Sequence, residues 1–288
     1  MSIHKSILIR VGGIGAAIAA LCLVWLQAQQ PPKQPLNVQK VTDNLWVIMT
    51  GDSGNVAVLP TSEGVLLVDD KFDQYGQDIL AKVKAISDKP IKYILNTHQH
   101  GDHTGGNAFM LMNTPAEILI HKNARANMVA GKQPGLPQVT FPDEADVFVG
   151  GKEVSAHHLG RGHTNGDSVI LFPSERVLHT GDLFVNGSAP FIDYSAKGSI
   201  VEWDKTLDRV LKLDFDIVIP GHGPVAKKAD LVKWRNSIAE LRSRAKKACA
   251  GGAADALKRL DLAGLNMDNS LGFLDRSVPG MCAELKAE

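Results

Sequence analysis

The segment THQHGDHTGG, residues 97–106, is the most informative part of this chain about its fold and its chemistry. It carries three histidines, His98, His100 and His103, together with Asp102. Imidazole nitrogen and carboxylate oxygen are the ligands that zinc and similar divalent metals prefer. Four such groups crowded into one short loop indicate a metal site, because a bound cation neutralises the cluster.

The spacing of these residues predicts two neighbouring ions. Residues 91–96, IKYILN, form a short apolar and partly β-branched run, which predicts a buried strand that ends just before His98. His98 and His100 are two residues apart in an extended turn, so they can point to the same side and hold one ion. Asp102 and His103 then face a neighbouring position, where a second ion fits.

Three later turns complete the cluster. His163 lies in GRGHT (160–164), Asp182 in HTGDL (179–183) and His222 in IPGHGP (219–224), and each turn follows an apolar run. A single histidine beside glycine is more often part of a surface turn than a ligand. Together, however, the three turns supply a third histidine for one ion, a carboxylate between both ions and a second histidine for the other.

These motifs, together with Asp69 in LLVD (66–69), resemble those of the metallo-β-lactamase superfamily over residues 36–226. The resemblance implies an α/β protein with the four-layer αββα sandwich of the metallo-β-lactamase fold. Asp182 would bridge two ions, and Asp69 would orient a ligand through hydrogen bonds, with Asp70 as the alternative. The implied ligands of the two ions are, in turn, His98, His100 and His163, and Asp102, His103 and His222.

The resemblance also implies a hydrolase that uses two zinc ions, with iron or manganese as alternatives. A hydroxide bridging the ions would attack a carbonyl carbon, with Asp102 and Asp182 as the catalytic carboxylates. Lactamases that bind their second metal through cysteine need a thiolate near position 182, where this chain has aspartate. We therefore expect a small-molecule ester, thioester or lactone as substrate and at most weak action on β-lactams, as in the glyoxalase-II-like branch.

Other functions remain open at this point. The chain is alternatively a true metallo-β-lactamase, a mononuclear iron enzyme that oxidises sulfur compounds, or a metal-binding module without catalytic activity. Tyr194 follows Asp182 and is a candidate substrate-binding residue, because its hydroxyl can donate a hydrogen bond to a developing oxyanion. Packing in a core is the commoner role for an aromatic side chain at such a position.

Residues 1–28 have the pattern of a signal peptide or an N-terminal anchor. Lys5 and Arg10 precede an apolar run over residues 11–26, which is long for a signal core and short for a membrane span. We expect cleavage near Ala28 and export to the periplasm. Contact with a membrane would come only through this segment if it stays attached.

Composition excludes one class of partner. The 31 basic side chains balance the 31 acidic ones, and no basic cluster stands out. A nucleic-acid partner is therefore not expected, since such proteins carry a positive footprint. No feature of the sequence indicates an oligomeric state.

The last segment, residues 227–288, predicts a helical extension rich in alanine, lysine, arginine and leucine. It either packs on the catalytic layer or contributes part of the substrate pocket. Cys249 and Cys282 lie within it, and in an oxidising compartment they either pair or remain free and buried.

Alternation and helical periodicity predict a mixed α and β chain without internal repeats. The expected helices cover 74–86, 200–213, 230–250 and 253–260. The expected strands cover 45–49, 55–59, 65–68, 91–96, 117–120, 146–149, 153–157, 168–172, 177–179 and 216–219.

Overall fold

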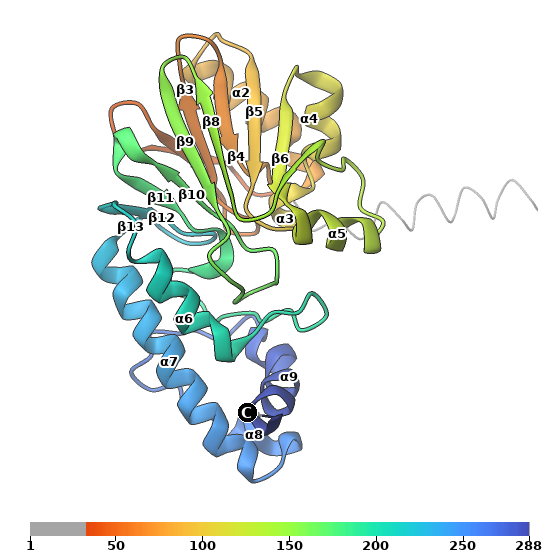
Figure 1. Ribbon diagram of the computed structural model, residues 1–288, viewed down its shortest axis with the longest axis vertical. Coiled ribbons are helices and arrows are strands. Elements are labelled where there is room, and N and C mark those ends of the chain that lie inside the picture. The colour runs from red at the N-terminus through yellow and green to blue at the C-terminus, as the bar shows by residue number, and fades with distance from the viewer. Residues whose placement is uncertain (1–32, 288) are drawn as a thin grey trace, which may run out of the picture. The chain divides into compact units, whose positions relative to one another are not determined.

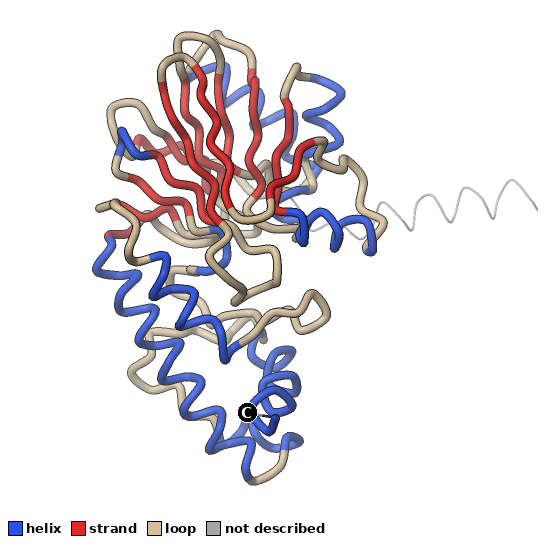
Figure 2. Tube along the Cα trace, in the orientation of Figure 1, coloured by secondary structure: helices blue, strands red, loops and turns tan. Residues whose placement is uncertain are grey.

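The computed structural model describes residues 33–287 (Figures 1 and 2). The predicted signal peptide or anchor, residues 1–28, lies outside the described residues. Among the helices of the described part, none is long and apolar enough to cross a membrane.

Two β-sheets form the centre of the described chain (Figure 2). The first runs in chain order through β1 (Asn37–Lys40), β2 (Trp46–Met49), β3 (Val56–Pro60), β4 (Val65–Val68), β5 (Ile91–Asn96), β6 (Glu117–His121) and β7 (Val139–Phe141). The second is ordered β13 (Ala226–Lys227), β12 (Ile217–Ile219), β11 (Val177–His179), β10 (Val169–Phe172), β9 (Lys152–His157) and β8 (Glu144–Val149).

Helices cover the outer faces of both sheets (Figure 1). Those beside the first sheet are α2 (Gly76–Ile86), α3 (Gly101–Thr104), α4 (Asn107–Asn113) and α5 (Lys122–Ala130). Those beside the second sheet are α6 (Ile200–Val210) and α7 (Lys228–Ala250). The last two, α8 (Ala256–Arg259) and α9 (Phe273–Ala287), pack against α7 beyond the sheet.

The side-chain alternation of β4 shows why the layers form. Val65 and Leu67 are fully buried in a cluster shared with α2 and α4. Leu66 and Val68 point the other way, into a cluster shared with β9, β10 and β11 of the second sheet. Each such side chain contributes about 1.5–3 kcal/mol by leaving water. A strand that is apolar on both faces therefore requires a layer on each side.

A third apolar cluster lies on the outer face of the second sheet. Leu178 of β11 and Val218 of β12 pack there against Trp203 of α6 and Trp234 of α7. Three clusters between four layers confirm the predicted αββα sandwich.

Parallel strand pairs bring distant turns to one edge. In the first sheet β4 runs parallel to β5, and Val68 lies opposite Leu95. In the second sheet β11 runs parallel to β12, and His179 lies opposite Ile219. The turns that follow the two members of each pair therefore leave the sheet side by side.

The two edges also meet each other. Ser168 N donates to Thr97 O at 2.8 Å, and Asn55 N donates to Gly221 O at 2.7 Å. These hydrogen bonds join the segment before β10 to the loop after β5, and β3 to the turn after β12. All the predicted ligand turns consequently converge on one end of the sandwich.

The predicted elements are found, with boundaries shifted by a few residues. The sequence missed the short strands β1, β7 and β13 and the short helices α3 and α4, which hold too few residues to show a period. It also missed α9, a 15-residue helix that contains Pro279 and Gly280. Both residue types are poor helix formers, so they hid its amphipathic pattern.

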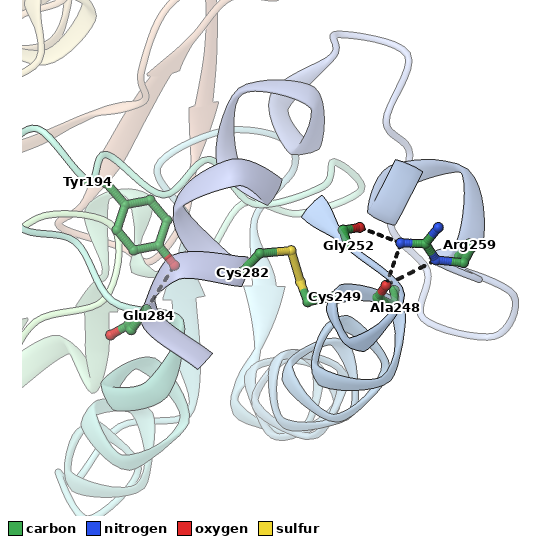
Figure 3. Close-up of a disulfide and its surroundings, with 7 residues drawn as sticks. All are labelled: Tyr194, Ala248, Cys249, Gly252, Arg259, Cys282 and Glu284. Atoms are coloured by element: carbon green, nitrogen blue, oxygen red, sulfur yellow. Dashed lines mark hydrogen bonds between the residues drawn. A yellow bond between two sulfur atoms is a disulfide. The ribbon is translucent and has the colours of Figure 1, made fainter. Parts of the chain in front are cut away.

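The C-terminal helices share their core with the rest of the chain. Residues 34–288 form one compact unit, and α7 and α9 contribute to the same apolar cluster as α6 and the second sheet. A disulfide joins Cys249 at the end of α7 to Cys282 of α9 (Figure 3). Of the two states left open for these cysteines, the structure shows the paired one.

Candidate metal centre

Three imidazoles meet in the first half of the site. His98 follows β5 directly, His100 precedes α3, and His163 lies in the loop between β9 and β10. His100 Nδ1 is 3.2 Å from His98 Nε2 and 2.7 Å from His163 Nε2. His98 and His163 are buried and His100 is half-buried. The three nitrogens thus face one point.

The outer nitrogens of these rings determine which inner atoms carry lone pairs. His163 Nδ1 lies 2.7 Å from the carbonyl oxygen of Phe191, which can only accept, so this nitrogen bears the proton. His100 Nε2 lies 2.8 Å from the carboxylate of Asp193 and donates to it. The lone pairs of His100 Nδ1 and His163 Nε2 therefore point at each other. A cation between them removes this repulsion, so the geometry fits a bound metal.

The second half of the site combines two imidazoles with carboxylate. His103 Nε2 lies 3.3 Å from His222 Nε2. Asp102 Oδ2 lies 3.1 Å from His222 Nε2 and 3.6 Å from His103 Nε2. Asp102 and His103 belong to α3, and His222 belongs to the turn after β12.

Asp182 lies between the halves. Its Oδ1 is 3.2 Å from His103 Nε2 and 3.4 Å from His222 Nε2, while its Oδ2 is 3.6 Å from His163 Nε2. Within the described residues Oδ1 is buried without a hydrogen-bond partner. A buried carboxylate oxygen without a donor is costly, and a bound cation would satisfy it.

The predicted ligand set is therefore brought together, and the structure groups its atoms into overlapping triads. The ligand atoms of each triad lie within 4.8 Å of one another. The triads are His98, His100 and His163; His98, His103 and Asp182; and Asp102, His103 and His222.

The two halves differ in charge. Burial, with the nearby His100, lowers the pKa of His163 to about 4. Burial acts in the same direction on His222, but Asp182 and Asp102 outweigh it and raise the pKa of His222 to about 9. The first half thus sets imidazoles against one another, whereas the second holds its imidazoles against carboxylates.

Asp69 lies behind His103. It is fully buried, and its Oδ2 accepts from His103 Nδ1 and from Thr97 Oγ1, both at 2.8 Å. Its Oδ1 accepts from Thr97 N at 2.8 Å. This arrangement leaves the lone pair of His103 Nε2 directed into the cluster. Asp70, the alternative, instead accepts from Gly106 N at 3.0 Å.

Tyr194 is placed away from the role expected for it. Its hydroxyl donates to Glu284 Oε2 of α9 at 2.9 Å (Figure 3). Its ring lies against Gly280. Burial and the neighbouring Glu284 carboxylate raise the pKa of the Tyr194 hydroxyl. The hydroxyl thus has a structural partner on the C-terminal helix, which removes the observation that would favour substrate binding.

Two glycines allow the ligands to approach. A Cβ on Gly221 would lie 2.0 Å from Asp182 Oδ1, and a Cβ on Gly54 would lie 2.3 Å from the His103 ring. Neither contact is possible for a real side chain, so both positions require glycine for close backbone approach.

The sequence did not reveal two residues of this site. Asp193 contacts His100, but it lies in an irregular segment that no strand pattern placed. Lys71 follows two aspartates and reads as a solvated charge, yet it is fully buried and donates to Gly54 O at 2.5 Å. Burial lowers the pKa of Lys71 to about 7, although Asp52, among other carboxylates, opposes this. Gly54 N in turn donates to Asp102 O at 3.1 Å. Lys71 therefore holds the loop at Gly54 against the second half of the candidate site.

Comparison with known proteins points to one family. The sequence pattern of the Metallo-beta-lactamase superfamily matches residues 49–222. A metallo-beta-lactamase type 2 from Bacillus cereus is 27% identical over 211 residues and is matched over 68% of this chain and 80% of its own length. The 2,4-dinitroanisole O-demethylase subunit alpha of Nocardioides sp. (strain JS1661) is 28% identical over 244 residues, which cover 81% of this chain and 68% of that protein.

Among solved structures, the DIM-1 metallo-beta-lactamase has a similar fold. The TM-score is 0.64 at 21% identity, and the match covers 72% of this chain and 99% of that one. The metallo-beta-lactamase from Pontibacter korlensis gives a TM-score of 0.63 at 22% identity, over 69% of this chain and 96% of that chain. These likenesses concern the fold.

Proposed function

The chain belongs to the metallo-beta-lactamase superfamily. We propose that it is a hydrolase with two zinc-type ions and that it cleaves ester, thioester or lactone bonds of a small molecule. The observation that carries the proposal is the position of Asp182. One of its oxygens faces His163 of the first half and the other faces His103 and His222 of the second. A single carboxylate in this position supports two ions held side by side.

When bound, divalent ions of this kind supply an activated water at neutral pH and polarise a carbonyl group. The chain's own residues do the rest. Asp69, Asp193 and the carbonyl of Phe191 orient the imidazoles, so that the site is assembled before substrate arrives. Asp182 sets the separation of the two halves.

Asp102 has a second role in this proposal. Its side chain is 23% exposed, so it lies toward the open side of the cluster. Burial raises its pKa, but His103 and His222 more than offset this and hold the pKa well below its ordinary value. Asp102 is therefore an ionised carboxylate, and its Oδ2 would accept a hydrogen bond from a water that enters the site.

The substrate class follows from the reactivity of the bond. Activated esters, thioesters and lactones have carbonyl groups that accept a nucleophile more readily than ordinary amides, and the strained amide of a β-lactam lies between them. The ligand set of this chain, with Asp182 and without a thiolate, supports the ester-type substrates.

A true metallo-beta-lactamase is the second candidate. The similarity to the type 2 metallo-beta-lactamases of Bacillus cereus and Elizabethkingia meningoseptica favours it, at 27% and 23% identity. A 2,4-dinitroanisole O-demethylase subunit is 28% identical to this chain. A relative with similar sequence identity is therefore not named a lactamase.

The test is a substrate panel on protein whose metal content has been measured. We expect about two zinc-type ions per chain, loss of turnover with a chelator and its return with added metal. Lactones or thioesters should be hydrolysed and β-lactams weakly or not at all. Efficient turnover of several β-lactams with none of the ester-type substrates would instead establish a lactamase. A single redox-active iron in active protein would contradict the two-metal mechanism.

A further inference from the structure

The first half of the metal centre rests on residues 191–200, which we call the support segment. The carbonyl of Phe191 accepts from His163 Nδ1, and the carboxylate of Asp193 accepts from His100 Nε2. Asp193 N also donates to His163 O at 2.9 Å, and Ser199 N donates to Gly162 O at 2.8 Å. The support segment thus holds both rings from outside and the backbone of the loop that carries one of them.

The support segment itself is held by helix α9. Ile192 N donates to Ser277 Oγ at 2.9 Å, and Ser277 is fully buried. Glu284 accepts from the Tyr194 hydroxyl at 2.9 Å, from Ile200 N at 3.0 Å and from Ser199 Oγ. These hydrogen bonds hold the support segment near both of its ends and at Tyr194.

Helix α9 is in turn fastened to α7. The disulfide between Cys249 and Cys282 closes a loop of 33 residues (Figure 3). Cys282 and Glu284 are two residues apart on α9 and therefore project from different faces of the helix. Cys282 bonds to α7, and Glu284 binds the support segment. Leu274 and Met281 pack α9 into the apolar cluster with α6 and α7.

We propose that the disulfide-fastened helix α9 is a positioning element for the metal half-site of His98, His100 and His163, acting through Ser277 and Glu284 on the support segment. The inference rests on the proposed metal site but goes beyond it, because it assigns a role to the C-terminal extension. The second half of the centre is held differently, by Asp69 behind His103. Loosening α9 should therefore affect the two halves unequally.

The expected size follows from known outer partners of metal ligands. Removing a group that directly holds a ligand lowers metal affinity about 10- to 100-fold. Ser277 and Glu284 act one contact further away. We therefore expect about a tenfold loss of affinity for one of the two ions when the support from α9 is removed.

The experiment uses the full mature chain with variants that introduce no new metal ligand. Cys249→Ala/Cys282→Ala removes the disulfide, Ser277→Ala removes the acceptor for Ile192 N, and Glu284→Gln keeps the shape of the side chain. Arg259→Ala is the matched control. Arg259 binds Ala248 O at 3.0 and 2.8 Å and so holds the end of α7 near the disulfide without contacting the support segment.

Zinc affinity at each half is measured by competition with a chelator, and cadmium-113 NMR reports the two bound ions separately. Asp193→Asn identifies the resonance of the first half, because Asp193 contacts His100 directly. We expect the same resonance to shift or broaden in the double cysteine variant, Ser277→Ala and Glu284→Gln, with about a tenfold weaker site. In Arg259→Ala both resonances and both affinities should stay as in wild type, even if the unfolding temperature falls.

Three outcomes would overturn the proposal. They are unchanged metal affinity in all three α9 variants, equal weakening of both halves, and weakening that follows unfolding temperature alone, including in Arg259→Ala. The unaltered oxidised protein separates this proposal from the proposed function. If it binds two ions and the variants do so equally well, only the role of α9 fails. If it binds no metal, the proposed function fails as well.

Discussion

The side chain of Asp182 lies between the two halves of the candidate metal centre, whose residues come from separate parts of the sequence. Asp182 lies in the turn that follows β11, and Gly221, which has no Cβ, leaves room for its Oδ1. Burial raises its pKa, but His222 and His103 outweigh burial and lower the pKa well below the ordinary value. The residue therefore stays a carboxylate, which is the form that can serve two cations.

Replacing this carboxylate should cost both metal and turnover. We expect Asp182→Ala to lose one of two ions and at least about 100-fold in kcat, because several kcal/mol of transition-state stabilisation depend on the second ion. Metal analysis with steady-state kinetics measures both effects. Tyr194→Phe is the comparison, and it should remain within a few-fold of wild type since its hydroxyl binds Glu284. Full metal content and full activity in Asp182→Ala would exclude the bridge.

Asp69 and Asp70 are adjacent in sequence but bind different groups, the ring of His103 and the backbone of Gly106. Asp69→Asn should lower metal affinity at the second half about 10- to 100-fold, because the amide no longer offers a charged acceptor to His103 Nδ1. Burial and the nearby Asp69 raise the pKa of Asp70 well above its ordinary value. The Asp70 side chain accepts from Gly106 N rather than from His103, so Asp70→Asn should lower metal affinity less than Asp69→Asn does. Zinc competition on both variants tests this, and equal losses would show that Asp69 has no special role.

At the scale of elements, the junction of β6 and α5 shows how a histidine can be structural. His121 caps α5 by accepting from Asn123 N through Nδ1 at 3.4 Å, and its Nε2 donates to Pro142 O at 2.7 Å. Its ring stacks on His158 with 3.9 Å between centroids. Only the neutral ring can make both hydrogen bonds, and burial together with His158 lowers the pKa of His121 to about 4.

This junction should make stability depend on pH. The unfolded chain binds a proton at this histidine near pH 6.5 and the folded chain only near 4, so the contribution of neutral His121 is complete above pH 6.5 and is lost as pH falls toward 4. The shift corresponds to on the order of 3 kcal/mol. In addition to His158, the nearby charges are Lys122, which lowers the pKa of His121, and Asp143, which raises it.

The test compares wild type with His121→Asn, which keeps a capping side chain but cannot become charged. Urea unfolding at pH 7 and pH 4.5 should show a smaller acid-induced loss of unfolding free energy in the variant. Parallel pH dependence in the two proteins would mean that His121 contributes nothing to acid sensitivity.

At the scale of the whole molecule, the C-terminal helices belong to the same unit as the metal centre. Their disulfide bears on location, because such bonds form and persist in oxidising compartments. We therefore propose export to the periplasm, in line with the charged and apolar pattern of residues 1–28.

Two measurements on the natural protein test this location. N-terminal sequencing should begin near Gln29, and thiol labelling of the unreduced chain should detect neither Cys249 nor Cys282. An intact Met1 in a cytoplasmic fraction, with both thiols free to react, would contradict export.

The sequence alone was enough to predict the candidate metal ligands and the strands that precede them. His98, Asp182 and His222 could be recognised because each follows a short apolar run that predicts a buried strand, and such patterns are local. The family motif then implied which residues share an ion. The four layers also follow from strands such as β4, which are apolar on both faces.

The groups that hold these candidate ligands in place became visible only in the folded chain. Asp193, Lys71, Ser277 and Glu284 lie in irregular segments or on a helix whose period Pro279 and Gly280 obscure. Their partners are distant in sequence: 93 residues separate Asp193 from His100, and 85 separate Ser277 from Ile192. Periodicity and motif spacing report local conformation, whereas these contacts exist only after the two sheets and the C-terminal helices have packed together.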